Sequence, residues 1–155
     1  MSDTVTAQVD VRGPRFTAWI TTAVLVSVLL MWQFSPGWAV TVLAAQAVVF
    51  AIGATWGPRH HPYGRLFSRW VAPRLAPVTE REPVTPLRFA QLVGLIFAVI
   101  GVAGFAFFPV VGLIATAFAL AAAFLNAAFG ICLGCQLYPL VTRLRTVVAG
   151  TGSSR

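Results

Sequence analysis

Residues 16–55 read FTAWITTAVLVSVLLMWQFSPGWAVTVLAAQAVVFAIGAT, and this stretch decides the fold. Two apolar runs without a charged side chain flank the short turn sequence Ser35-Pro36-Gly37. Each run has about the 20 residues that a helix needs to cross a hydrocarbon core of about 30 Å. The pattern recurs at residues 89–131, with Phe108-Pro109-Val110 at the turn. We therefore expect four transmembrane helices, at about residues 16–35, 37–56, 88–108 and 110–131.

The composition agrees with a membrane protein. Hydrophobic residues make up 58% of the 155 residues and charged residues only 10%, which is too few to cover a soluble globule. The uninterrupted apolar runs lack the alternation of barrel strands, which excludes a β-barrel, and the first run is too long for the core of a signal peptide. The expected fold is an all-α integral membrane protein of a bacterial plasma membrane.

The arginines predict the orientation in the membrane. All eleven cationic side chains are arginines; they lie before the first helix, between the second and third, and after the fourth, and both short turns lack them. Because positively charged segments stay in the cytoplasm, both termini and the middle segment are expected there, and the net charge of +7 does not indicate nucleic-acid binding. Residues 1–14 then form a cytoplasmic tail, 15–142 one membrane domain with a cytoplasmic loop at 57–87, and 143–155 a second tail.

The middle segment is rich in proline, which argues against one long helix. Within it, residues 63–75 (YGRLFSRWVAPRL) mix arginines with large apolar side chains. Such a stretch suits a short helix that lies in the lipid headgroup layer. A surface on which a partner protein docks is the alternative.

An internal repeat relates the two halves of the chain. With a shift of 73 residues and no gap, the matches fall at the helix entry, the outer turn and the helix exit. We expect two helical hairpins of the same orientation, related by a pseudo-twofold axis along the membrane normal, as in parallel-repeat membrane folds. The matched segments are Arg15-Phe16 with Arg88-Phe89, Pro36 with Pro109, and Ala54-x-Trp56-Gly57 with Ala127-x-Phe129-Gly130.

The two cysteines of the chain stand together as Cys132-Leu133-Gly134-Cys135, at the cytoplasmic end of the fourth run. Their spacing is that of dithiol redox pairs and also of half a zinc site. The second thiol can reach a mixed disulfide on the first, so the pair can close a disulfide or relay a sulfur atom. If Gly130 ends the fourth helix, Cys132 begins a terminal helix whose positive end favours its thiolate; an unbroken helix gives no such help. Inert buried cysteines are the remaining interpretation.

Other polar residues are candidates for tuning the thiols. Under the repeat, both hairpin exits lie on one side of the membrane, which would place Arg59, His60 and His61 near the cysteines. Positive charge from Arg59, Arg143 or a protonated His60 would favour the thiolates. Asn126 stands shortly before the cysteine pair, where it can tune the site or hold its helix against a partner helix.

A zinc site is the less favoured interpretation of these residues. Its four candidate ligands are Cys132, Cys135, His60 and His61. Adjacent histidines rarely bind one ion together, because they leave a helix or strand in different directions. Haem attachment is excluded, since Gln136 stands where the CxxCH motif requires His. We predict no metal and no other cofactor.

Four segments of the sequence carry a resemblance to a known family. They are residues 10–16 (DVRGPRF), 57–64 (GPRHHPYG), 86–91 (PLRFAQ) and 124–138 (FLNAAFGICLGCQLY). In these segments the chain resembles the small actinobacterial membrane proteins of the domain-of-unknown-function 4395 family, over about residues 8–142. The resemblance implies a CxGC-type motif on the last helix, a redox or sulfur-relay role for it, and a cytoplasmic thioredoxin-like or sulfurtransferase protein as partner.

We therefore predict a membrane thiol–disulfide or persulfide relay, in which Cys132 attacks or carries the sulfur and Cys135 resolves the intermediate. One alternative is a small channel or transporter for a sulfur-containing anion, for which a homo-oligomer would have to supply the polar path. The other is a non-enzymatic membrane scaffold that recruits the cytoplasmic partner through the arginine-rich loop. The lipid bilayer is an expected partner in each case, and nucleic acid is not.

Overall fold

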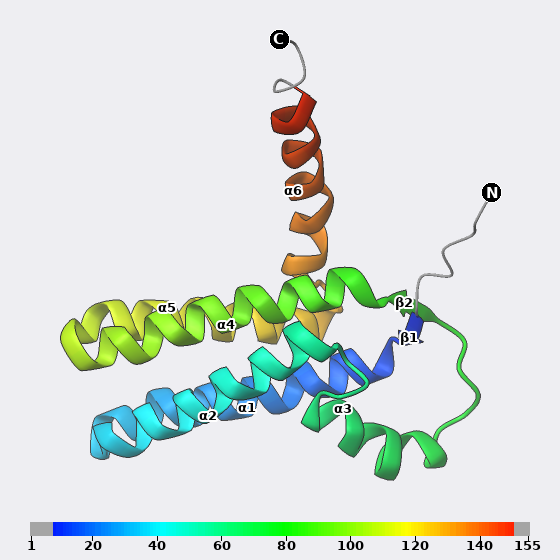
Figure 1. Cartoon of the computed structure of the whole chain (residues 1–155). Coiled ribbons are helices and arrows are strands. Elements are labelled where there is room, and N and C mark those ends of the chain that lie inside the picture. Colours follow the sequence, from blue (N-terminus) through cyan, green and yellow to red (C-terminus); the bar gives the residue numbers. More distant parts are fainter. Residues whose placement is uncertain (1–7, 151–155) are drawn as a thin grey trace.

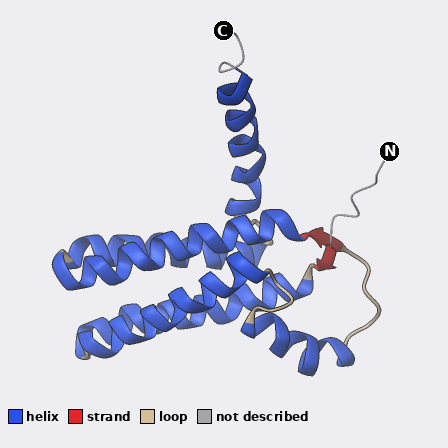
Figure 2. Ribbon diagram, in the orientation of Figure 1, coloured by secondary structure: helices blue, strands red, loops and turns tan. Residues whose placement is uncertain are grey.

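A computed structural model describes residues 8–150 of the chain. Its bundle consists of four long helices, α1 (Arg12–Phe34), α2 (Pro36–Trp56), α4 (Val84–Phe107) and α5 (Pro109–Phe129). Each of the four is long and apolar enough to cross a membrane. Figure 2 shows how fully helix dominates the described residues. The predicted all-α fold with four membrane-spanning helices is confirmed, whereas parts of the two predicted tails lie outside the described residues.

The helices form two hairpins that lie side by side, α1 with α2 and α4 with α5, and both tight turns are at the same end (Figure 1). The turns are built alike. The N–H of Ser35 donates to the carbonyl of Met31 at 2.7 Å, and the N–H of Phe108 donates to that of Gly104 at the same distance. A proline then opens the next helix, where its missing N–H costs nothing.

The second helices of the hairpins also end alike. Gly57 follows α2 with φ 80°, and Gly130 follows α5 with φ 70°, both values that favour glycine. A shift of 73 residues carries the bounds of α2 onto those of α5 and the last residue of α1 onto that of α4. Such equivalent bounds are what the predicted repeat of two hairpins requires.

Each hairpin also caps the other through an arginine. Arg88, near the start of α4, donates to the carbonyls of Ala54 and Thr55 at the end of α2, at 3.0 and 2.5 Å. Arg15, 73 residues earlier, makes the corresponding contacts at 3.5 and 3.4 Å to the last turn of α5. The last carbonyls of a helix have no partner within it and carry negative partial charge, so a cation there is stabilising.

Replacing Arg88 with Gln should therefore lower the thermal unfolding midpoint by about 3 °C, because the α2 terminus loses its cationic donor. Circular dichroism of the protein in detergent would measure the midpoint. Arg69→Gln is the matched control, since the Arg69 side chain is exposed and makes no hydrogen bond to any described residue. Equal midpoints for the two variants would contradict the capping role.

Two helices begin earlier than the sequence predicts, α1 at Arg12 and α4 at Val84. Their first turns carry polar residues that lie outside the apolar runs, so hydropathy alone misses them. Before them stand two short strands, β1 (Gln8–Asp10) and β2 (Arg81–Pro83), which pair antiparallel. The Arg12 side chain binds the Asp10 carboxylate at 2.9 Å, and this hydrogen-bonded contact lowers the pKa of Asp10.

The middle segment is an irregular helical stretch, formed by α3 (Pro62–Leu66), the π-helical turn η1 (Phe67–Val71) and the 3₁₀ turn η2 (Ala72–Arg74). These residues nearly coincide with the predicted helix at 63–75. The ring of Phe67 is buried and lies 5.6 Å from that of Phe16, which holds the segment against α1. Trp70, in the same segment, is 57% exposed at the end of the bundle opposite to the two tight turns (Figure 1). Such an exposed Trp at the end of the spans is typical of the lipid headgroup layer.

The last helix, α6 (Leu133–Gly150), starts against α4 in the part of the bundle away from the two turns and projects out from the four long helices (Figure 1). Residues 143–150 continue this helix, although the sequence analysis placed them in a tail. Gly130 separates α5 from α6. The fourth apolar run therefore ends as a helix at Gly130 and does not continue unbroken through the cysteines. A terminal helix at this place was expected only if the fourth helix ended at Gly130, and that condition holds.

Candidate functional site

The two cysteines are joined by a disulfide at the start of α6, with their Cα atoms 5.1 Å apart. Cys132 stands directly before the helix, and Cys135 lies in its first turn. The backbone N–H of Cys135 donates to Sγ of Cys132 at 3.3 Å, and the N–H of Gln136 donates to the carbonyl of Cys132 at 3.0 Å. Cys132 therefore occupies the capping position of α6, with its sulfur at the end where the N–H groups point.

This position makes the two sulfurs unequal once the disulfide is reduced. A negative charge on Cys132 faces the positive end of the helix and a backbone donor, which favours the thiolate. Cys135 lies inside the first turn and has no equivalent donor aimed at its sulfur among the described residues. Cys132 is thus the better nucleophile, and Cys135 is placed to attack a mixed disulfide on it.

Two glycines bring the cysteine pair to this place. Gly130 adopts the left-handed conformation and ends α5. Its N–H donates a hydrogen bond to the carbonyl of Asn126 at 3.0 Å. Gly134 then packs directly on α4, where a Cβ atom would lie 2.5 Å from Cα and 2.6 Å from Cβ of Ala90. Only glycine allows so close an approach. The sequence analysis gave Gly134 no role, although its place inside the CxGC motif was the available signal.

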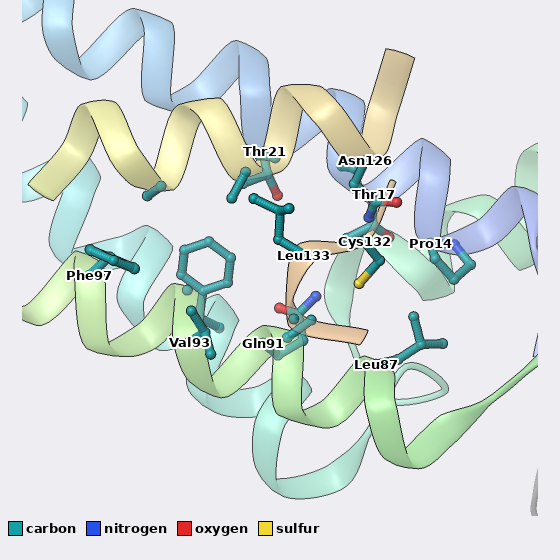
Figure 3. A pocket seen from close by; sticks show the side chains of 18 of the residues that line it. Pro14, Thr17, Thr21, Leu87, Gln91, Val93, Phe97, Asn126, Cys132 and Leu133 are labelled. Carbon is teal, nitrogen blue, oxygen red and sulfur yellow. The ribbon is translucent and has the colours of Figure 1, made fainter. Parts of the chain in front are cut away.

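A cavity of about 310 Å³ opens beside Cys132, between α1, α4, α5 and the start of α6 (Figure 3). Most of its lining is apolar, and in Figure 3 the sulfur of Cys132 faces the space toward Gln91. At the far end, the cavity reaches Phe118, whose ring is 60% exposed on the outer surface of the bundle. The polar side chains in the lining are those of Thr17, Thr21, His61, Gln91 and Asn126.

His61 is the most confined of these polar residues, with 2% of its surface exposed. Burial lowers the pKa of the ring to about 4, so His61 is neutral at pH 7. The neighbouring amide of Gln91 acts in the opposite direction and raises the pKa, but less than burial lowers it, and neither ring nitrogen makes a well-formed hydrogen bond to any described residue. The Oε1 atom of Gln91 is likewise buried without a partner among the described residues. Unpaired buried polar groups are rare in folded proteins, so a pair of them beside a disulfide needs an explanation.

The structure brings some predicted site residues together and leaves others apart. His61 and Asn126 line the same cavity as Cys132. Arg59 and His60 are exposed and are not part of its lining; Nδ1 of His60 lies 3.2 Å from the carbonyl of Trp56 instead.

Arg143, the remaining residue predicted to tune the thiols, is also not part of the cavity lining. Arg143 is exposed on α6, more than two turns after Cys135. A role of Arg143, Arg59 or His60 in tuning the thiols stays a prediction. Within residues 8–150, no group of three or more His, Cys, Asp and Glu side chains is placed to hold a metal ion.

Sequence reasoning missed three of the polar residues in the cavity, Thr17, Thr21 and Gln91. Threonines inside apolar helices commonly bond to their own backbone, so they carry no signal of a site. Gln91 did stand out as an isolated amide in an apolar run. No role was predicted for it from the sequence, and only the packed structure places it in one cavity lining with Cys132 and His61.

The comparisons with known proteins point to one family. No curated protein and no solved structure matches the chain. A family model described as Domain of unknown function (DUF4395) matches residues 9–143. The match takes in both hairpins, the middle segment and the cysteine pair. The chain therefore belongs to the DUF4395 family, as the resemblance of its four segments indicates.

Proposed function

We propose that the protein is a membrane thiol–disulfide exchange protein in which Cys132 attacks and Cys135 resolves. The observation that carries the proposal is the placement of Cys132 as the cap of α6, with the Cys135 N–H donating to its sulfur. A persulfide relay would use the same nucleophile, with a sulfur atom in place of a partner's cysteine. The disulfide between the two cysteines favours the exchange reaction, because a resolving thiol within bonding distance closes the cycle.

The exchange proceeds in two steps. The Cys132 thiolate attacks one sulfur of a partner disulfide, so that a mixed disulfide forms and the partner's other sulfur leaves as a thiolate. The Cys135 thiol then loses its proton and attacks the Cys132 sulfur, which closes the Cys132–Cys135 bond and releases the partner's second thiolate. Two electrons pass to the partner, and the reverse sequence returns them.

The arginine distribution supports a cytoplasmic partner. The described arginines stand in the first two turns of α1 and α4, in β2 and the middle segment, and in α6, and these parts lie toward the end of the bundle opposite to the two tight turns (Figure 1). By the positive-inside rule this end, with both termini, faces the cytoplasm from the plasma membrane. Cytosolic reductants remove structural disulfides, so a disulfide there is one that opens and closes in use. A thioredoxin-like protein or a sulfurtransferase has the chemistry to exchange with it.

Trapping the mixed disulfide tests the proposal. We expect reduced Cys135→Ser protein to form a stable covalent adduct with a thioredoxin variant that keeps one active-site cysteine, activated as a mixed disulfide with thionitrobenzoate. Cys132 attacks the thioredoxin sulfur, thionitrobenzoate leaves as a thiolate, and neither protein holds a second thiol that could reverse or resolve the bond. Cys132→Ser should form none. A non-reducing gel followed by mass spectrometry of the adduct measures both outcomes and identifies the bonded cysteine.

The two serine variants serve as controls for each other. Adducts formed equally by both variants would contradict the assignment of the nucleophile, and adducts formed by neither would contradict exchange. The scaffold alternative predicts the second of these outcomes. A sulfur atom added to Cys132 after incubation with a sulfurtransferase and thiosulfate, without any mixed disulfide, would replace exchange by the persulfide relay.

A further inference from the structure

The cavity beside Cys132 has the shape of a site for a lipid-soluble molecule. Its volume of about 310 Å³ falls at the lower end of the range usual for small-molecule sites. Gly94 and Phe97 of α4 and Ala122 of α5 line it at the depth of the membrane spans. The lining also includes Phe118, which is 60% exposed on the outer surface of the bundle, so the place where a molecule dissolved in the bilayer would enter is beside this residue.

The polar atoms in the cavity indicate which polar groups the bound molecule carries. A neutral His61 ring has one N–H donor and one acceptor nitrogen, and both are unpaired among the described residues. Oε1 of Gln91 is an unpaired acceptor beside it. A ligand with oxygens that accept in one redox state and donate in the other would satisfy these groups. The acyl chain of a lipid would fill the space and leave them unpaired.

We infer that this cavity binds a lipid-soluble quinone, which oxidises the Cys132–Cys135 dithiol. The inference rests on the proposed thiol–disulfide exchange, and it names the membrane substrate of the same site. A quinone has a flat apolar body and carbonyl oxygens at its edge, to which the His61 N–H can donate. After reduction, a hydroxyl of the hydroquinone can donate to Oε1 of Gln91.

The reaction balances without a further reactant. The dithiol loses two protons and two electrons as the S–S bond forms, and the quinone gains them as its two carbonyls become hydroxyls. A cytoplasmic dithiol protein then reduces the disulfide again by the reverse of the two exchange steps given above: its thiolate attacks the Cys132 sulfur and Cys135 leaves as a thiolate, and its second thiol then attacks the mixed disulfide and releases Cys132. The net transfer carries electrons from cytoplasmic thiols to quinone in the membrane.

Two alanines of α5 provide a matched pair of variants. Ala122 lines the cavity, whereas its neighbour Ala121 is exposed and does not line it. Ala122→Leu fills part of the quinone space, and Ala121→Leu adds the same atoms outside it. Neither residue is part of the cysteine pair, so exchange with thioredoxin should stay within about twofold of wild type in both variants.

The assay uses the full chain in lipid nanodiscs, reduced and kept without oxygen. Decylubiquinone is the probe, because its fully substituted ring does not add thiols. Its reduction is followed by ultraviolet absorbance, together with the loss of two thiols per chain. We expect wild type and Ala121→Leu to reduce it, and Ala122→Leu to lose about tenfold or more in the second-order rate constant of quinone reduction.

Gln91→Met provides a second readout. It keeps the length of the side chain and removes the unpaired acceptor, so it should raise the decylubiquinone concentration that gives the half-maximal rate of thiol oxidation, without lowering the thermal unfolding midpoint. Wild type that exchanges with thioredoxin but does not reduce decylubiquinone would overturn the quinone site alone. Equal quinone rates for Ala122→Leu and Ala121→Leu would do the same. Failure of thioredoxin exchange in wild type would instead overturn the proposed function.

Discussion

Gly134→Ala is expected to slow exchange through the cysteine pair by tenfold or more, while the four membrane spans stay folded. The new Cβ atom would lie 2.5 Å from Cα of Ala90, which belongs to the α4 backbone and cannot move aside as a flexible side chain would. Overpacking of this kind shifts the neighbouring backbone. The start of α6 would move away from α4, and this shift would disturb the contact between the Cys135 N–H and Sγ of Cys132 that favours the attacking thiolate.

Exchange of the reduced variant with oxidised thioredoxin measures this effect, and circular dichroism shows whether the helices persist. Gly37→Ala is the matched control, because a Cβ atom there meets nothing within 4 Å and the turn lies at the other end of the bundle. Wild-type exchange by Gly134→Ala would show that the close contact with α4 is not needed. Loss of helix in that variant would show that the contact supports the whole fold.

The second large effect concerns the reduced protein, in which Cys132 should react with iodoacetamide about tenfold faster than Cys135 at pH 7. An ordinary thiol is only a few per cent ionised at this pH, and the thiolate is the reacting form. The donor from the Cys135 backbone and the positive end of α6 both favour the Cys132 thiolate. The advantage should widen at lower pH, where an ordinary thiol stops reacting.

Mass spectrometry of peptides after short labelling times gives the two rates separately. The same labelling in denaturant is the control, since the two thiols should then react equally once α6 is unfolded. Both cysteines are partly buried in the folded chain. A difference between their labelling rates therefore does not arise because one of them is fully enclosed. Faster labelling of Cys135 than of Cys132 would reverse the assigned roles and would contradict the capping geometry.

The cysteine site was predictable in part. The pairing of Cys132 with Cys135 follows from their spacing, and the choice of nucleophile depended on whether the helix breaks at Gly130. Sequence reasoning stated that condition and left it open, because an αL glycine and a helical glycine look the same in a sequence. The structure has the break, and the hydrogen bond onto Cys132 exists because α6 starts there.

The surroundings of the cysteines were predicted less well. Among the adjacent histidines, His61 lines the cavity and His60 points to the carbonyl of Trp56. Neighbouring residues outside regular structure take different directions, and nothing in their identity says which one turns inward. The structure shows that His61 is the buried one, because its ring packs against Gly53. A Cβ atom on Gly53 would lie 2.6 Å from that ring.

The sequence by itself determined the four spans, because an apolar run of about 20 residues in lipid can satisfy its backbone only as a helix. It also placed the outer turns and the cysteine pair, since proline, glycine and CxxC spacing act over a few residues. The tertiary structure alone decided that His61, Gln91 and Cys132 line one cavity. They come from three separate segments, and what joins them is the close packing of α6 on α4 at Gly134, a contact between residues far apart in the chain.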